Sequence, residues 1–374
     1  MKKTLALLLA VAFAVPAFAG NVLSNVETYG EIETIGFTQS EDAAAKSVAN
    51  RVLFGVSTDL VEDVRANLTF AYNNVWENTN GEVVNTYLNT IEVAEANVVI
   101  SNLFGALEAK IGRQFYGNED SPVMYIGPRH GSYLNITALP TMSMDGALLT
   151  WSNDSAALSA FYAQMTDPSD ERLTGVTFDY AFTNNLVAGV YWYDVSDDAP
   201  ERHMGIWGGK LAYQNEGTKL GVEYAKNYTN GVFSYNNIGW MLKADAALNL
   251  DMEKIALTPR LSYYISEKEF FAAGNYAPGI ALGNFVGPLS MTGEDWRVFN
   301  AGLDFGVKAW EKVTFAFDYL NAEIDRDWVG NEFDLKATYQ HNDYVSFTLG
   351  GGVVTNIPDT DDLYVGQLGM LIKF

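Results

Sequence analysis

The stretch VRANLTFAYN, residues 64–73, decides the fold, because apolar and polar side chains alternate along it. Residues two apart lie on the same face of a β-strand, whereas on a helix they would be spread around the axis. The stretch therefore predicts a strand with one apolar face and one face that contains Arg65, Asn67 and Thr69. A strand of this kind can separate lipid from water.

The same alternation recurs up to the last residue, Phe374, in about eighteen segments of roughly 9 to 13 residues. That length lets a tilted strand cross a bilayer, and no run after residue 20 is long and apolar enough for a membrane-spanning helix. The segments begin near residues 26, 49, 64, 89, 105, 144, 156, 173, 186, 204, 218, 237, 254, 295, 312, 331, 345 and 363. We therefore predict an all-β fold, a transmembrane antiparallel up-and-down β-barrel of about 18 strands (16–18), with both chain ends on one side.

Residues 1–19 are predicted to be a cleavable signal peptide. Lys2 and Lys3 form a positive start, residues 5–15 form an apolar core too short to span a bilayer, and Ala17-Phe18-Ala19 forms a small-residue cleavage site. No linker or low-complexity segment divides the rest of the chain. We therefore expect an exported mature protein, residues 20–374, that forms one barrel domain.

Composition excludes several classes of protein. The chain has no cysteine, which rules out disulfides and thiolate metal sites. It has 46 acidic and 23 basic residues, and loss of Lys2 and Lys3 would change the formal net charge from −23 to −25 (21 minus 46). Nucleic acid is therefore not expected as a partner. The surplus acid lies mostly in predicted loops, where it would attract cations or bind lipopolysaccharide through divalent ions: residues 119–120, 167–171, 194–201 and 359–362.

The connections between the predicted strands fall into two alternating classes. Short connections are rich in the turn residues Asn, Asp and Gly, and they lie at residues 59–63, 101–105, 183–185, 215–217 and 341–343. Long connections alternate with them, at residues 40–48, 77–87, 117–142, 194–203, 228–236 and 267–294. Short inner turns and longer outer loops are typical of bacterial outer-membrane barrels.

The cleavable signal, the alternating strands and the terminal Phe374 together resemble a Gram-negative outer-membrane porin. The resemblance implies an outer-membrane location, contact with lipid and lipopolysaccharide, and a C-terminal aromatic read by the barrel-assembly machinery. A narrower likeness, to alginate-export-type and related porins of about 18 strands, rests on residues 111–114 (Ile-Gly-Arg-Gln), followed by a long loop and residues 144–147 (Met-Asp-Gly-Ala). An alginate exporter would have a basic lumen, whereas the inward positions here are nearly neutral, so the cargo stays open.

Two long connections are candidates for narrowing the lumen. Residues 117–142 contain three prolines and the apolar run Met124, Tyr125 and Ile126, and residues 270–293 are rich in glycine and apolar side chains. Because apolar loop residues need cover from water, we expect the first connection to fold into the barrel. The second would do the same or plug part of the lumen. The alternative for the first is packing over the outer rim.

Charged residues at predicted inward positions and in the first long loop are the candidates for lining or constricting the pore: Arg65, Lys110, Arg113, Glu119, Asp120, Arg129, Lys243, Arg260, Asp304 and Lys336. Facing charges of opposite sign would set selectivity, and the alternative is a ladder of ion pairs between neighbouring strands. Strict alternation turns Arg113 towards lipid. Arg113 therefore lies either at the membrane interface or inward through a β-bulge near Gly112, and we expect the bulge.

The sequence contains no pattern that predicts catalysis. It has neither a Gly-x-Ser-x-Gly nor a His-Glu-x-x-His motif, and no calcium-binding loop, so we expect no enzyme, metal or cofactor. We predict a porin, a water-filled channel for passive diffusion of ions and small hydrophilic solutes. The alternatives are a substrate-specific channel for a sugar, organic anion or exported polysaccharide, and a surface adhesin or structural barrel. The strand pattern is compatible with a monomer and with a homo-oligomer.

Overall fold

The computed structural model describes residues 24–40, 46–78, 91–129, 141–165, 172–196, 203–228, 239–325, 327–355 and 362–374. The predicted signal peptide, residues 1–19, lies outside these ranges. Most of the predicted acidic loop residues between 167 and 201 and between 359 and 362 also lie outside them.

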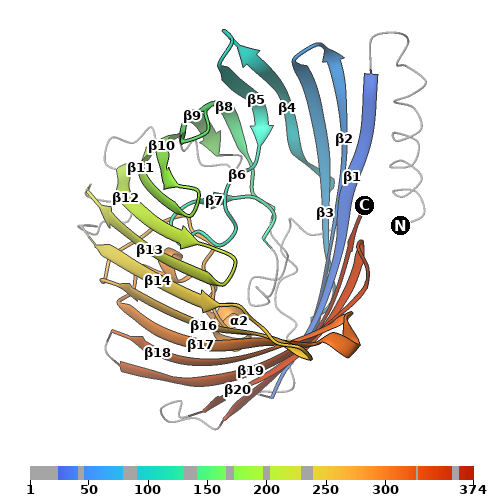
Figure 1. Cartoon of the computed structure of the whole chain (residues 1–374), viewed down its shortest axis with the longest axis vertical. Helices are drawn as coiled ribbons and strands as arrows, with labels where there is room; N and C mark the ends of the chain where they lie inside the picture. Colours follow the sequence, from blue (N-terminus) through green and yellow to red (C-terminus); the bar gives the residue numbers. More distant parts are fainter. Residues whose placement is uncertain are drawn as a thin grey trace.

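Eighteen long strands form one closed antiparallel sheet (Figure 1). Each strand pairs with the next along the chain, and the last pairs with the first from Lys373 opposite Glu31 to Val365 opposite Gln39. The strands are β1 (Ser24–Gln39), β2 (Lys46–Val61), β3 (Val64–Asn78), β4 (Ile91–Leu103), β5 (Leu107–Gln114), β8 (Met144–Ser152), β9 (Ala156–Met165), β10 (Arg172–Thr183), β11 (Leu186–Ser196), β12 (His203–Gln214), β13 (Thr218–Asn227), β14 (Trp240–Leu248), β16 (Ile255–Ser266), β17 (Trp296–Val307), β18 (Val313–Ile324), β19 (Asp327–Asn342), β20 (Val345–Thr355) and β21 (Leu363–Lys373). The predicted all-β barrel of about 18 strands is confirmed.

Short and long connections alternate around most of the barrel as predicted; the exception is the outer connection between β18 and β19, where only two residues separate Ile324 from Asp327. The short ones join β2 to β3, β4 to β5, β8 to β9 and so on, and we call their end of the barrel the inner end. One of them contains the two-residue strand β15 (Leu250–Asp251), and another the 3₁₀ turn η3 (Lys308–Trp310). In this turn Lys308 Nζ lies 2.6 Å from a carboxylate oxygen of Asp251 in β15, at the inner end.

The outer face of the barrel is apolar along its length. Large apolar side chains that alternate with inward residues are left uncovered by the rest of the chain, among them Tyr162, Phe178, Val190, Leu211, Leu261, Leu335, Leu349 and Leu368. Because such a surface is stable only against lipid, it is the surface expected of a membrane barrel. The period-two pattern of the sequence therefore identifies the lipid-facing residues.

Two long connections fold into the barrel (Figure 1). We call residues 115–129, the described first half of the β5–β8 connection, loop A. Loop A contains the small hairpin of β6 (Tyr116–Gly117) and β7 (Tyr125–Ile126). We call residues 267–295, between β16 and β17, loop B. Loop B contains the short helix α2 (Ala281–Phe285) and the 3₁₀ turn η2 (Leu289–Met291).

Loops A and B contact each other and the inner surface of the wall. The Tyr125 amide donates to the Ala273 carbonyl (2.8 Å), and the Asn275 amide donates to the Ser121 carbonyl (2.8 Å). Val123, Met124 and Ile126 of loop A pack with Phe270, Ala272, Leu282 and Leu289 of loop B against inward residues of the wall: Phe161, Tyr193, Ile206, Met241, Tyr264, Val298 and Leu320. The hydrophobic core of this protein is therefore the contact between its loops and its wall. No helix in the described ranges is long and apolar enough to cross a membrane.

Candidate functional site

A cavity of about 900 Å³ lies inside the barrel, between loops A and B and the inner end. Strands β12 to β14 and β16 to β19 supply its wall, and the loops supply Glu119, Asp120 and residues 275–279. Five of the residues predicted to line the pore meet at this cavity: Glu119, Asp120, Lys243, Arg260 and Lys336. They come from parts of the chain more than 200 residues apart, so the closure of the barrel is what brings them together.

Ion pairs along the wall hold several of these charges. Arg260 lies between two carboxylates, with Nε 2.8 Å from Asp304 and Nη2 3.2 Å from Asp318. The predicted residue Asp304 therefore contributes as the partner of Arg260. Lys336 makes no hydrogen bond or ion pair with any residue in the described ranges, so its ammonium group is available to a solute.

Lys243 shows how this lumen accommodates an ammonium group. Its Nζ lies 2.6 Å from a carboxylate oxygen of Asp245 and 4.7 Å from the centre of the Tyr276 ring. Tyr276 belongs to loop B, and its hydroxyl is hydrogen-bonded to the Ser262 hydroxyl of β16 (2.8 Å). Burial raises the pKa of the Tyr276 hydroxyl, so this group stays protonated.

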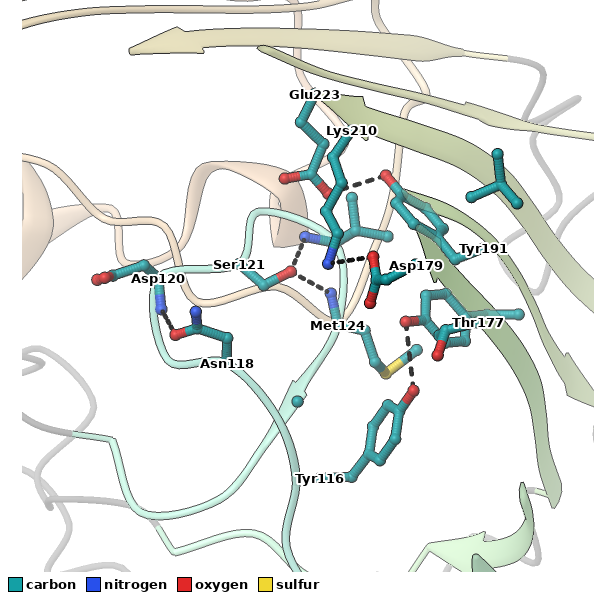
Figure 2. Close-up of a pocket in the computed structure, with 14 residues that line it drawn as sticks. Tyr116, Asn118, Asp120, Ser121, Met124, Thr177, Asp179, Tyr191, Lys210 and Glu223 are labelled. Atoms are coloured by element: carbon teal, nitrogen blue, oxygen red, sulfur yellow. Dashed lines mark hydrogen bonds and ion pairs between the residues drawn. The ribbon is translucent and has the colours of Figure 1, made fainter. Parts of the chain in front are cut away.

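A second cavity, about 310 Å³, lies between loop A and the inner faces of β10 to β13 (Figure 2). Three tyrosines line it: Tyr116 from loop A and Tyr191 and Tyr193 from β11. Three carboxylates, Asp120, Asp179 and Glu223, and one ammonium group, Lys210, also line it. Asp120 lines both cavities, so the tip of loop A separates them.

Hydrogen bonds hold the side chains of this smaller cavity in place. Lys210 Nζ lies 3.0 Å from Asp179, and the Tyr191 hydroxyl donates to Glu223 Oε1 at 2.9 Å. The Tyr191 and Tyr193 rings stack with centres 5.4 Å apart, and Tyr116 meets Tyr193 edge-on at 6.3 Å. Aromatic rings, carboxyl groups and hydroxyls thus line one small space.

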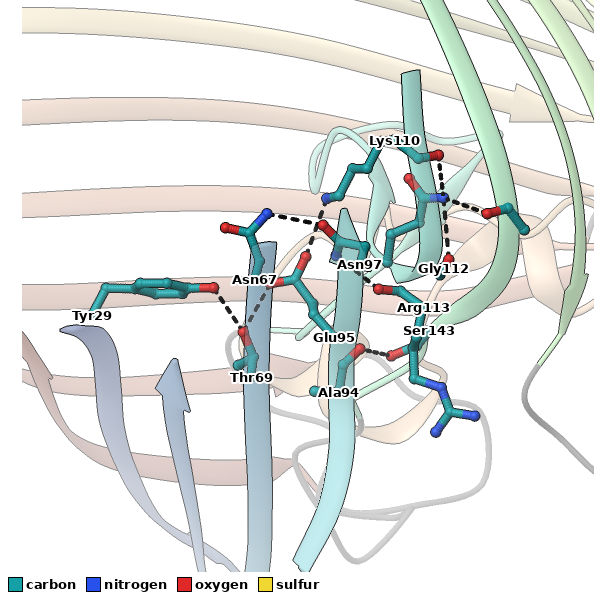
Figure 3. A network of polar contacts seen from close by, with 12 residues as sticks. Tyr29, Asn67, Thr69, Ala94, Glu95, Asn97, Lys110, Gly112, Arg113 and Ser143 are labelled. Carbon is teal, nitrogen blue, oxygen red and sulfur yellow. Dashed lines mark hydrogen bonds and ion pairs between the residues drawn. The ribbon is translucent and has the colours of Figure 1, made fainter. Parts of the chain in front are cut away.

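Arg65 and Lys110, two further predicted pore residues, belong to a polar ladder on the opposite part of the wall. Lys110 Nζ donates to Glu95 (3.2 Å), which also accepts from the Thr69 hydroxyl (3.0 Å) (Figure 3). Arg65 pairs with Glu27 and donates to the Ser57 hydroxyl (2.7 Å). Lys110 of β5 therefore pairs with the neighbouring strand β4, whereas Arg65 of β3 reaches across β2 to Glu27 of β1.

Arg129 anchors loop A to the wall. Its side chain is buried and donates to Met291 Sδ of loop B (3.4 Å), and its carbonyl accepts from Arg51 Nη1 (2.7 Å). Arg51 is fully buried on β2 and also pairs with Glu31 (2.9 Å) and Glu33 (2.7 Å). Arg129 therefore lines neither of the two cavities.

The expected inward turn of Arg113 is wrong. Pairing of β5 with β4 runs without a shift from Ala109 to Arg113, and the bulge lies one strand away, on β4 at Ala94. Arg113 stands opposite Asp145 on the outer face and binds it through two nitrogens, at 2.9 and 2.8 Å. The pair lies at the outer end of its strands, where the polar headgroups make an Arg on the lipid side tolerable.

Two carboxylates on β19 hold the start of α2. Glu332 accepts from the amides of Ala281 (2.5 Å) and Leu282 (2.9 Å), and Asp334 accepts from the amide of Ile280 (2.8 Å). Carboxylates at a helix N-terminus satisfy amides that have no partner within the helix. The pair therefore attaches loop B to the wall.

Sequence reasoning missed the residues that fix the loops. Glu31 and Glu33 share an inward face with Ile35 and Phe37, so β1 did not show a purely polar face. Tyr191 and Tyr193 also point inward, although an aromatic residue in such a strand is ordinarily expected at the lipid interface. Where the inward face of a strand carries both polar and apolar residues near the outer end of the barrel, this pattern indicates that a loop covers that part of the strand.

Comparison with solved structures shows that this fold is known. OpdQ of Pseudomonas aeruginosa aligns with a TM-score of 0.66 at 15% identity, over 94% of this chain and 99% of that chain. OccK9 (OpdG) of the same organism aligns with a TM-score of 0.66 at 11% identity, over 94% and 99%. OpdK of that organism, in a structure with vanillate, aligns with a TM-score of 0.64 at 11% identity over the same shares. No family model and no curated protein matches the sequence.

Proposed function

We propose that this chain forms a channel in the outer membrane of a Gram-negative cell, through which ions and small hydrophilic solutes diffuse passively. The observation that carries the proposal is the closed ring of 18 strands, apolar outside, that encloses a charged cavity of about 900 Å³. A barrel of this strand number leaves room for water unless loops fill it. Loops A and B narrow the lumen here, and a cavity persists below them.

A substrate-specific channel is the second candidate, and a specific observation favours it. The loops leave shaped cavities with fixed side chains, as at the stacked Tyr191 and Tyr193, where a wide porin would leave open water. The similar fold of OpdK, whose structure contains vanillate, also supports a channel that binds a small solute. The third candidate, an adhesin or structural barrel, has no such support.

Conductance of the purified protein in planar lipid bilayers tests the proposal. We expect steady, ohmic single-channel current in potassium chloride. Current that one class of solute interrupts at millimolar concentration would favour the substrate-specific channel. A protein that inserts as a folded barrel and carries no current would contradict the proposal and favour the structural barrel.

The expected partners follow from the surface of the barrel. Lipid would cover its apolar outer face, and lipopolysaccharide would contact its outer end, where Arg113 and Asp145 lie on the lipid side. The barrel-assembly machinery would recognise the terminal Phe374. No enzyme activity is proposed.

A further inference from the structure

The charge around the two cavities is not balanced. Seven carboxylates line one or both of them, against four lysines and one arginine: Glu119, Asp120, Asp179, Glu223, Asp245, Asp318 and Asp334, against Lys210, Lys219, Lys243, Lys336 and Arg260. The formal excess of two acidic side chains is concentrated at the smaller cavity, where three carboxyl groups face one ammonium group. Carboxylates in a narrow, low-dielectric passage raise the local concentration of cations and exclude anions.

Two of the three carboxylates in the smaller cavity, Glu223 and Asp120, make no ion pair with a residue in the described ranges, although Lys210 and Lys243 stand opposite Glu223 on the neighbouring strands. Asp179 is paired with Lys210 at 3.0 Å, whereas Glu223 accepts from the neutral Tyr191 hydroxyl. The Asp120 carboxylate makes no ion pair with any described residue and faces both cavities. The smaller cavity therefore retains carboxylate oxygens that a positively charged solute can approach.

The same cavity supplies aromatic rings. Tyr116 and Tyr191 line it together with Glu223 (Figure 2). Tyr193 lines it as well. The face of an aromatic ring attracts an ammonium group, and it does so more strongly where water is partly excluded. A carboxylate beside an aromatic ring favours a cation, and neither group attracts an anion.

Elsewhere in the lumen, a carboxylate and an aromatic ring already hold an ammonium group of the protein itself. Lys243 places its ammonium group between Asp245 (2.6 Å) and the face of Tyr276 (4.7 Å). An ammonium group held between a carboxylate and a tyrosine is thus stable in this lumen, and the smaller cavity offers the same two kinds of group without filling the space between them. Its volume of about 310 Å³ is sufficient for a small organic molecule.

We infer that the smaller cavity binds the ammonium group of a small organic cation, and that the channel prefers cations to anions. This inference rests on the proposed function, because a selectivity requires a conducting channel. Glu223 and Asp120 supply the charge, and the rings of Tyr191 and Tyr193 supply the apolar contact. The solute gives up part of its hydration to these groups as it passes loop A.

Reversal potentials across a potassium chloride gradient test the preference. We expect the permeability of potassium to exceed that of chloride for the native protein, and the ratio to move towards one in Glu223→Gln. This substitution keeps an acceptor for the Tyr191 hydroxyl and removes only the charge. Asp145→Asn is the matched control, because Asp145 lies on the lipid side of the wall. A native ratio below one, or equal ratios in Glu223→Gln and the native protein, would overturn the inference.

Block by a solute tests the binding site. Tetramethylammonium chloride is expected to interrupt the native current at millimolar concentration, whereas sodium benzoate is not. Tyr193→Leu keeps apolar bulk and removes the ring, so the half-blocking concentration of tetramethylammonium should rise roughly fivefold with little change in the potassium-to-chloride ratio. Block by benzoate alone would contradict the site. So would a half-blocking concentration of tetramethylammonium that is the same in Tyr193→Leu and Glu223→Gln as in the native protein.

Folding of every variant is checked by the mobility shift between unheated and boiled samples on a gel. A folded native barrel without current would overturn the proposed channel itself. A conducting barrel with anion preference would overturn only the cation site.

Discussion

Phe374 closes the barrel at the level of single residues. Its amide and carbonyl exchange hydrogen bonds with Gly30 of β1, at 3.0 and 2.8 Å. Its ring packs against Phe54, with ring centres 6.4 Å apart, and lies over Gly30. The terminal aromatic that the sequence suggested as an assembly signal therefore also stabilises the seam between the first and last strands.

Substitution of Gly30 by alanine should weaken this seam. A Cβ atom there would overlap the Leu53 carbonyl and lie 2.8 Å from the Phe374 ring, so we expect a loss of roughly 1–3 kcal/mol in the free energy of unfolding. The measurement is urea unfolding in detergent, followed by tryptophan fluorescence. Gly36→Ala on the same strand is the control, since its Cβ would meet nothing closer than 3.8 Å. Equal stability of the two variants would show that Phe374 does not constrain Gly30.

Arg51 is the residue on which loop A depends most. It is fully buried between Glu31, Glu33 and the carbonyl of Arg129. A buried charge is tolerated only where it is paired, and removal of one partner leaves the others unpaired. Arg51 therefore contributes to the position of the loop as well as to the stability of the wall.

Arg51→Gln should cost about 3–5 kcal/mol and release loop A from the wall. The expected readouts are a lower urea midpoint and faster proteolysis between residues 115 and 129. Arg65→Gln is the matched control, because Arg65 also pairs with a glutamate of β1, Glu27. Arg65 is partly exposed, so a loss of about 0–1 kcal/mol in the free energy of unfolding is expected. Similar losses in the two variants would contradict a special role for Arg51.

At the level of elements, loops A and B give the lumen its shape. Each is held by backbone hydrogen bonds to the other and by carboxylates or an arginine on the wall. The short helix α2 has no acidic side chain in its first turn, and the carboxyl groups of Glu332 and Asp334 of β19 accept the hydrogen bonds of its first amides instead. Loop B is therefore positioned by a strand that follows it by about 50 residues in the sequence.

Glu332→Gln combined with Asp334→Asn should loosen loop B. Neutral side chains bind the start of α2 more weakly, so we expect noisier current with openings larger than those of the native protein. Single-channel recording measures this directly. Glu311→Gln, in an exposed inner turn, removes a carboxylate of the same chain without touching either loop. Traces that match the native protein in noise and amplitude would contradict the role of the pair.

At the level of the whole molecule, the absence of cysteine allows a test of orientation. Lys268 and Glu253 lie in the connections at opposite ends of β16, at the outer and inner ends of the barrel. A maleimide attached to a polymer too large for the pore should label Lys268→Cys on intact cells. It should label Glu253→Cys only after lysis. The reverse pattern would invert the orientation of the barrel and the assignment of every loop.

Much of the fold could be predicted from the sequence. The predicted strand near residue 144 is present as Met144–Ser152, and the largest displacement of a predicted start is four residues, at Asp327 against 331. These predictions are correct because strand alternation and turn chemistry depend on neighbouring residues. Arg113 was placed wrongly because the position of a bulge depends on pairing between strands, and here the extra residue is Ala94 on β4.

The sequence by itself determined the approximate number of strands, most of the lipid-facing residues and the positions of the short turns, because lipid and water act on each strand in the same way along its length. Only the tertiary structure decided which inward residues are covered by loops and which charges face the cavities. The inward Tyr193 and Met241 are buried by loop A or loop B, while Lys243, two residues from Met241, reaches the larger cavity. That difference arises from contacts between residues far apart in the sequence, which no local pattern records.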